Sequence, residues 1–193
     1  MPLLPPEPNL YPADLFTGAG AETPEPGRVW WVLHTKPRQE KSIARQLLQA
    51  RVPFYLPVIA RRCLVRNRVL QSYVPLFAGY VFLLADRTER VTALATNRVV
   101  RTLEVFDQQG LWQDLSQVFR LIASGAPIMP EARLVPGATV VIRSGPLAGL
   151  KGKILRTASG QRFVVQVDFI QQGASVLLDD FRLAPAEEET PAL

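Results

Sequence analysis

The chain has 193 residues, of which 48% are hydrophobic, so it can build one folded domain or two small ones. Its 22 Lys and Arg residues against 17 Asp and Glu give a formal net charge of +5, which favours a polyanionic partner. A single cysteine excludes an internal disulfide, and one cysteine with one histidine cannot form a zinc-ligand set.

Both ends of the chain are acidic and the middle is basic. Residues 1–27 hold four acids, no Lys or Arg, and seven of the 17 prolines, so we expect a disordered, Pro-rich acidic leader there. Residues 186–193 form a short acidic tail with three glutamates. Without these seven acids the net charge rises from +5 to +12. We expect no secretory signal and no membrane span, and therefore a cytoplasmic protein.

The first ordered elements are predicted to be a strand and a helix. The run Val29 to Leu33 is aromatic and β-branched, which is typical of a strand. Thr35 is expected to cap the following helix, Pro37 suits its first turn, and Pro53 ends it. One face of this helix carries an apolar stripe, formed by Ile43, Ala44, Leu47 and Leu48.

A basic segment follows, between two predicted strands at Phe54 to Ile59 and Val69 to Val74. Asn67 tolerates a left-handed turn, so we expect a protruding β-hairpin with a basic tip. Its arginines either point into solvent while their stems cover a core, or they contact a phosphate backbone. Residues 61–68 contain four arginines and no acid: Arg61, Arg62, Arg66 and Arg68.

The run Pro75 to Leu84 is the most apolar of the chain and predicts a central strand. Gly79 lies inside it, and a glycine there is typical of a bulge that turns neighbouring side chains outward. Two interpretations follow. Either every ring of this run is core, or one face of the strand offers aromatic rings to a partner.

A second helix is predicted to begin with a capping box of Asp86 and Glu89 and to end at Asn97. Its inward residues are expected to be Val91, Leu94 and Ala95. A strand at Val99 to Phe106 precedes a third helix that starts near Asp114. The order strand, helix, strand pair, helix, strand is that of a ferredoxin-like split βαβ fold, so the fold class is α+β.

The last third of the chain is predicted to be a linker and a small β domain. Ser124 to Pro136 holds three prolines and little periodicity, which favours an extended linker. Five short strands with glycine-marked corners follow between Thr139 and Leu183, and they indicate a small closed barrel.

Four stretches in this order and spacing carry a family resemblance. They are Trp30-Trp31-Val32-Leu33 with Lys36, Pro75 to Phe82, Asn97-Arg98-Val99, and the glycine-rich run Val140 to Ile154, which looks like a KOW motif. Over about Trp30 to Pro185 the chain resembles the NusG family of transcription elongation factors, which includes RfaH-like specialised paralogues. The resemblance implies an NGN domain at 28–125, a linker at 126–136 and a KOW domain at 137–185, a five-stranded SH3-like β-barrel.

The resemblance also implies a transcription elongation or antitermination factor that binds the clamp helices of RNA polymerase and suppresses pausing. The implied docking surface consists of Phe77, Tyr80 and Phe82 with Phe54 and Tyr55 as neighbours. Complete burial of Phe77, Tyr80 and Phe82 would contradict it. Of the run that contacts the polymerase gate loop in RfaH-like members, only Thr92 is matched here.

Two further surfaces are implied. The positions that read non-template DNA in RfaH-like members correspond to His34, Lys36, Gln39 and Arg98, although a lone histidine is equally compatible with a packed surface residue. The partner-binding position of the KOW domain falls on Phe169 and Ile170, where Rho or a small-subunit ribosomal protein would bind; Phe169 is equally compatible with barrel core.

Other functions find less support. Asp168, Asp179 and Asp180 have no histidine near them in sequence, and there is no glycine-rich phosphate loop, so we expect no enzyme, no cofactor and no metal site. A ribosome-associated RNA-binding module is the alternative, because KOW barrels also occur in ribosomal proteins.

The expected oligomeric state is a monomer. The acidic leader and the Pro75-Leu76-Phe77 lead-in favour a specialised paralogue, and β-branched runs in the KOW domain favour a barrel over a helical hairpin.

Overall fold

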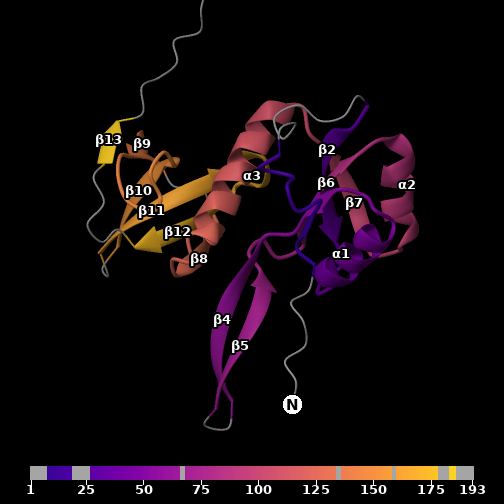
Figure 1. Ribbon diagram of the computed structural model, residues 1–193, viewed down its shortest axis with the longest axis horizontal. Helices are drawn as coiled ribbons and strands as arrows, with labels where there is room; N and C mark the ends of the chain where they lie inside the picture. Colours follow the sequence, from indigo (N-terminus) through magenta and orange to yellow (C-terminus); the bar gives the residue numbers. More distant parts are fainter. Residues whose placement is uncertain are drawn as a thin grey trace, which may run out of the picture. The chain divides into compact units, whose positions relative to one another are not determined.

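The computed structural model describes residues 8–18, 27–65, 68–133, 136–157, 160–177 and 183–185 (Figure 1), with the backbone alone at 62–65, 68–70 and 183–185. The chain separates into two compact units, Met1–Trp112 and Gln113–Leu193, here called unit 1 and unit 2. The division falls within the third helix, α3 (Gln108–Ala123).

Unit 1 contains a five-stranded sheet in the order β1-β3-β6-β2-β7. All four neighbouring pairs are antiparallel. The predicted central run forms β6, whose residues Val81 to Ala85 are buried, so both of its faces are covered. The strands are β1 (Leu10–Tyr11), β2 (Val29–Thr35), β3 (Phe54–Tyr55), β6 (Tyr80–Ala85) and β7 (Val99–Glu104).

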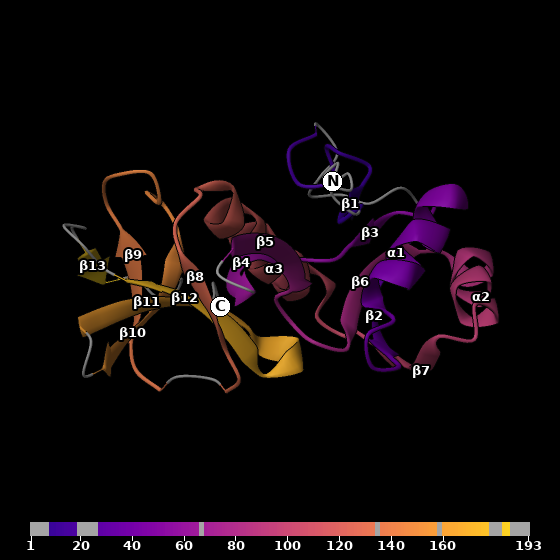
Figure 2. The ribbon, with the colours of Figure 1, turned by 90° about the horizontal axis from the view of Figure 1, so that it is seen from below.

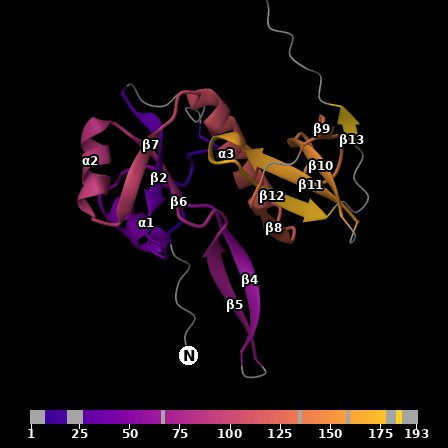
Figure 3. The ribbon, with the colours of Figure 1, turned by 180° about the vertical axis from the view of Figure 1, so that it is seen from behind.

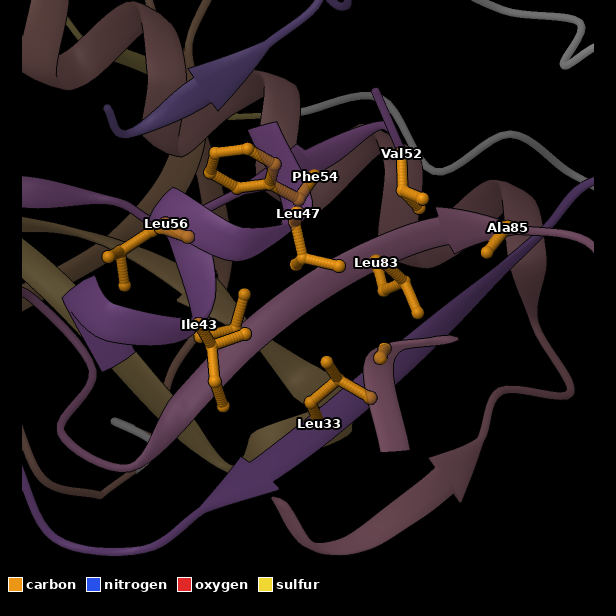
Figure 4. Close-up of a cluster of buried hydrophobic side chains, with 11 residues drawn as sticks. Leu33, Ile43, Leu47, Val52, Phe54, Leu56, Leu83 and Ala85 are labelled. Carbon is orange, nitrogen blue, oxygen red and sulfur yellow. The ribbon is translucent and has the colours of Figure 1, made fainter. Parts of the chain in front are cut away.

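Helix α1 (Glu40–Gln49) covers one face of this sheet with Ile43, Ala44 and Leu47 of the predicted apolar stripe, whereas Leu48, the fourth predicted member, is 38% exposed. Figure 4 shows Ile43 and Leu47 of α1 above Leu33 and Leu83 of the sheet. The predicted start of the helix is wrong, because Thr35 ends β2, where its amide donates to the Gly79 carbonyl at 2.8 Å. Arg38 has a φ of 62°, a left-handed conformation that a helix cannot include, so α1 begins only after it.

Helix α2 (Arg87–Ala95) starts with the predicted capping box of Asp86 and Glu89. Its predicted inward face is wrong: Val91 is 58% exposed, Leu94 and Ala95 are also exposed, and Ala93 is buried instead. The orientation follows two contacts at the start of the helix. Glu89 accepts two hydrogen bonds from Arg28, at 3.0 and 2.6 Å, and Arg90 lies 4.5 Å from the centre of a Trp31 ring. These contacts hold the start of α2 in an orientation that points Ala93 towards the sheet.

The predicted hairpin is present as a separate two-stranded sheet that protrudes from unit 1 (Figures 1 and 3). It consists of β4 (Val58–Val65) and β5 (Arg68–Pro75), paired from Val58 with Pro75 to Val65 with Arg68. The strands are longer than predicted and lie closer to the tip. Arg61 and Arg62 therefore belong to a strand and not to the turn.

The expected disordered leader, residues 1–27, has structure over residues 8–18. Leu10 and Tyr11 form β1, which pairs with β3, and Leu15 is buried. The prediction is wrong for this part because composition averages over residues 1–27 and hides the four large apolar residues within 8–18, which are Leu10, Tyr11, Leu15 and Phe16.

Unit 2 contains a six-stranded antiparallel sheet in the order β13-β9-β10-β11-β12-β8 (Figure 2). The predicted linker 126–136 contains the edge strand β8, which pairs with β12. Gly152 of β10 admits no side chain, because a Cβ there would lie 2.5 Å from the Val164 carbonyl oxygen. The elements are β8 (Ile128–Glu131), β9 (Thr139–Ile142), β10 (Lys151–Thr157), β11 (Gly160–Val167), the 3-10 turn η1 (Asp168–Ile170), β12 (Gln172–Leu177) and β13 (Leu183–Pro185).

Helix α3 begins six residues before its predicted start at Asp114. Asp107 precedes it and accepts a hydrogen bond from the Gly110 amide at 2.8 Å, which caps the first turn. The additional segment begins with Gln108-Gln109-Gly110, which holds no apolar side chain and does not predict a helix, whereas Leu111, four residues before Leu115, continues the apolar stripe and was missed.

Candidate functional site

The rings expected to form an exposed docking surface are mostly buried. Phe77 is 1% exposed and Phe82 0%, and they meet edge to face with ring centres 6.2 Å apart. Phe54 and Tyr55 are equally buried, Phe54 within the cluster under α1. The expected exposure is therefore wrong for these four rings, because both faces of the sheet are covered. Polymerase binding by this region stays a prediction.

Tyr80 is different, since it is only partly buried. It is the first residue of β6 and lies across from His34 of β2, with the two ring centres 5.4 Å apart. Gly79 holds this corner: its φ is +82°, its amide donates to a Glu40 carboxylate oxygen at 2.7 Å, and its carbonyl accepts from Thr35. A side chain at position 79 would be strained in this left-handed conformation, so the glycine fixes where Tyr80 points.

The four predicted DNA-reading residues lie together at this same end of the sheet. The Lys36 amide donates to the Arg98 carbonyl at 2.8 Å, and the Arg98 guanidinium donates to the Gln39 side-chain oxygen at 2.6 Å. Lys36 is exposed, whereas His34, Gln39 and Arg98 are half-buried. The end of β2, the start of α1 and the start of β7 thus place a polar, basic group of side chains beside Tyr80.

One member of this group was missed. Arg101 of β7 is exposed and lies directly across from His34 in the β2–β7 ladder. Side chains of cross-strand partners share a face, so Arg101 adds a positive charge on the face that carries His34 and Tyr80. Only the strand register reveals it, because 67 residues separate Arg101 from His34 in the sequence. We call His34, Lys36, Gln39, Tyr80, Arg98 and Arg101 the basic corner.

The hairpin arginines are described only in part. Arg61 is exposed on β4, while Arg62 and Arg68 are described by their backbone alone and Arg66 lies outside the described residues. Tyr73 of β5 is an exposed aromatic residue on the same hairpin. An accessible arginine and an accessible ring on a protruding two-stranded ribbon are suited to contacts with nucleic acid.

The remaining predicted positions lie elsewhere. Thr92 is exposed on α2, and its hydroxyl donates to the Thr88 carbonyl at 3.2 Å. In unit 2, Phe169 and Ile170 form the turn η1 after β11. Phe169 is half-buried and Ile170 is buried, so Ile170 offers little surface to a partner.

Within the described ranges, no group of three or more His, Cys, Asp or Glu side chains is placed to hold a metal ion. Burial raises the pKa of the Tyr55 hydroxyl above its ordinary value, which keeps this group neutral. As far as the chain is described, no helix is long and apolar enough to cross a bilayer.

Comparison with known proteins identifies the family. The family model described as "Transcription termination factor nusG" matches residues 28–124, half of the chain. The chain belongs to the NusG family. NusG proteins are transcription factors that bind RNA polymerase, so this NusG-family protein acts in transcription elongation or termination. The match covers the sheet from β2 to β7, the hairpin and the three helices.

Among solved structures, the chain is similar to a structure described as "Domain interaction in Thermotoga maritima NusG". The identity is 16% and the TM-score 0.44, and the match covers 78% of this chain and 93% of that one. The comparison with curated proteins gives no match.

Proposed function

We propose that this NusG-family protein binds RNA polymerase with unit 1, suppresses pausing and acts as an elongation or antitermination factor by binding alone. One observation carries the proposal. At one end of the sheet that the family model matches, the basic corner joins a partly exposed aromatic ring, Tyr80, to basic groups at the end of β2 and the start of β7 and to Gln39 at the start of α1. Such a combination can contact a protein and a neighbouring phosphate backbone together.

The domain architecture is part of this proposal. Residues 28–125 are proposed to be an NGN domain with split βαβ topology, supported by the strand order β3-β6-β2-β7 and two helices between these strands along the chain. Residues 137–185, within unit 2, are proposed to be a KOW domain with an SH3-like barrel of five strands, to which β8 adds a sixth. Gly152, where β10 passes against the Val164 carbonyl, is consistent with closely packed β-strands.

Polymerase docking is proposed to centre on Tyr80, with the clamp helices as the partner. Phe77 and Phe82 are buried and support the position of this ring from the core. Thr92 is exposed on α2 and is the proposed contact to the gate loop. Phe54, expected as a neighbour of the docking surface, acts in this proposal through the packing of β3, whereas Tyr55 pairs with Phe82 on the face that carries Tyr80.

Non-template DNA is proposed to contact the basic corner and the hairpin. The corner offers Lys36, Arg98 and Arg101, while the hairpin offers Arg61 and, from the sequence, Arg62, Arg66 and Arg68. We expect Arg61→Ala to reduce the slope of log K against log salt for DNA in the elongation complex by about 0.9, the value for one lost phosphate contact. Arg87→Ala, which removes an exposed arginine from α2, is the control. Equal slopes for both variants would contradict hairpin binding to DNA.

Unit 2 is proposed to recruit a second partner, Rho or a small-subunit ribosomal protein, through the η1 turn. The half-buried ring of Phe169 supports this assignment better than Ile170 does, because Ile170 is buried. A ribosome-associated RNA-binding module remains the alternative, and co-purification with ribosomes but without polymerase subunits would favour it.

We further propose that the protein is a cytoplasmic monomer of the RfaH-like specialised type. Occupancy at a few genomic loci, and not along all transcribed genes, would support specialisation.

The docking proposal is tested with Tyr80→Ala. Purified RNA polymerase should bind this variant at least about 30-fold more weakly, the loss that follows removal of an aromatic hot spot of about 2 kcal/mol. The matched control is Phe106→Ala, which truncates a ring that is 90% exposed in unit 1 but lies outside the basic corner. Unchanged circular dichroism would show that both variants are folded. Full-strength binding by Tyr80→Ala would contradict the proposed docking site.

A further inference from the structure

Residues Pro8–Gly18, here called the N-terminal arm, add a strand to the edge of the sheet in unit 1. Leu10 pairs with Tyr55 and Tyr11 with Phe54, and the Leu56 amide donates to the Asn9 carbonyl at 2.7 Å. In the strand order, β3 would be the edge strand if β1 were absent. The arm therefore occupies a strand-addition site that β3 provides.

The arm also delivers an aromatic ring to the face of the sheet. Phe16 lies 4.9 Å from Tyr55, edge to face, and 6.1 Å from Trp30, nearly parallel to it, measured between ring centres. Two turns hold this part of the arm: the Leu15 amide donates to the Pro12 carbonyl at 3.1 Å, and the Gly18 amide donates to the Asp14 carbonyl at 2.7 Å. Trp30 and Tyr55 are each 1% exposed.

The register shows which face the arm covers. Tyr55 lies across from Phe82, and Phe82 is two residues from Tyr80 on β6, so these three side chains share a face. Leu33, Phe54 and Leu83 each adjoin a residue of that face in their strands, so they point to the other face. There they belong to the cluster under α1. Phe16 thus covers the face that carries Tyr80 and lies opposite α1.

We propose that the N-terminal arm is an intramolecular competitor of RNA polymerase, which must displace it to dock on this face. The inference rests on the proposed function of unit 1. The attachment is short: it consists of a two-residue strand, the buried Leu15, Tyr11 beside the cluster under α1 and the ring of Phe16, so it can be released without unfolding the sheet beneath. The apparent affinity for polymerase is then the intrinsic affinity multiplied by the fraction of molecules whose arm has left the sheet.

Two variants of the full protein test the inference. Phe16→Ala removes the ring, deletion of residues 1–18 removes the whole arm, and Thr17→Ala, at an exposed neighbour of Phe16, is the control. Hydrogen exchange at the Leu56 amide, which bonds to the arm, reports arm release in the absence of polymerase. Exchange should become at least about tenfold faster in both variants and remain unchanged in Thr17→Ala.

Polymerase affinity is then measured on the same proteins. The affinity should rise by about 3-fold to 10-fold in Phe16→Ala and at least as much in the deletion variant. A larger fraction of the molecules then has the polymerase-binding face uncovered. Accelerated Leu56 exchange with unchanged or weaker polymerase binding would overturn the inference and leave the proposed function intact. If neither the unaltered protein nor any variant binds polymerase, the proposed function fails and the inference fails with it.

Discussion

The two faces of the sheet in unit 1 are covered in different ways. On one face, α1 contributes a continuous apolar stripe, and Figure 4 shows its side chains packed closely onto those of β2, β3 and β6. On the opposite face, Phe16 contacts Tyr55 and Trp30 from an arm that has two strand residues and one buried side chain, Leu15. Gln108, at the start of α3, adds hydrogen bonds to both backbone groups of Trp30, at 2.6 and 3.1 Å.

This difference separates a permanent core from a replaceable cover. A helix that buries a stripe of several large side chains contributes many kcal/mol, and removing it unfolds the domain. A short arm contributes little, and the sheet beneath it persists when the arm leaves. The face that a partner uses is therefore expected to be the one with the smaller intramolecular cover.

The largest expected effect concerns the helix-covered face. Leu47→Ala should lower the free energy of unfolding by about 2 to 5 kcal/mol, because it leaves a cavity under α1 at a side chain that is 1% exposed. Leu48→Ala, the adjacent residue of the same helix, is the matched control; it is 38% exposed and should cost less than about 1 kcal/mol. All three tryptophans of the chain lie in unit 1, so urea unfolding followed by tryptophan fluorescence measures this unit. Equal losses for the two variants would remove the distinction between the faces.

Local spacing was enough to predict the elements of this core. The β-branched and aromatic runs predicted β2 and β6, the apolar stripe predicted the inward face of α1 except for the exposed Leu48, and the pair Asp86 and Glu89 predicted the start of α2. Each of these signals lies within a few residues of the structure it produces. The inward face of α2 was wrong because it depends on Arg28, which is distant in sequence and anchors Glu89.

The site could be predicted less completely, because it depends on what covers the second face of the sheet. His34, Lys36, Gln39 and Arg98 meet at one corner, but Arg101 became visible only through the register of β7 against β2. The burial of Phe77 and Phe82 could not be read from β6 alone. An apolar strand needs covers on both faces, and neither periodicity nor composition shows whether the second cover is the chain itself or a partner.

The smallest expected effect concerns the arm-covered face and sharpens the comparison most. Phe16→Ala should lower the free energy of unfolding of unit 1 by only about 1 to 2 kcal/mol, since Phe16 is half-buried and its removal leaves β2, β3 and β6 paired. Thr17→Ala, measured by the same tryptophan fluorescence, should stay within about 0.5 kcal/mol of the unaltered protein. A loss as large as that of Leu47→Ala would mean that the arm is part of the permanent core. Such an arm could not be displaced by a partner at moderate cost, because its release would then require the sheet itself to open.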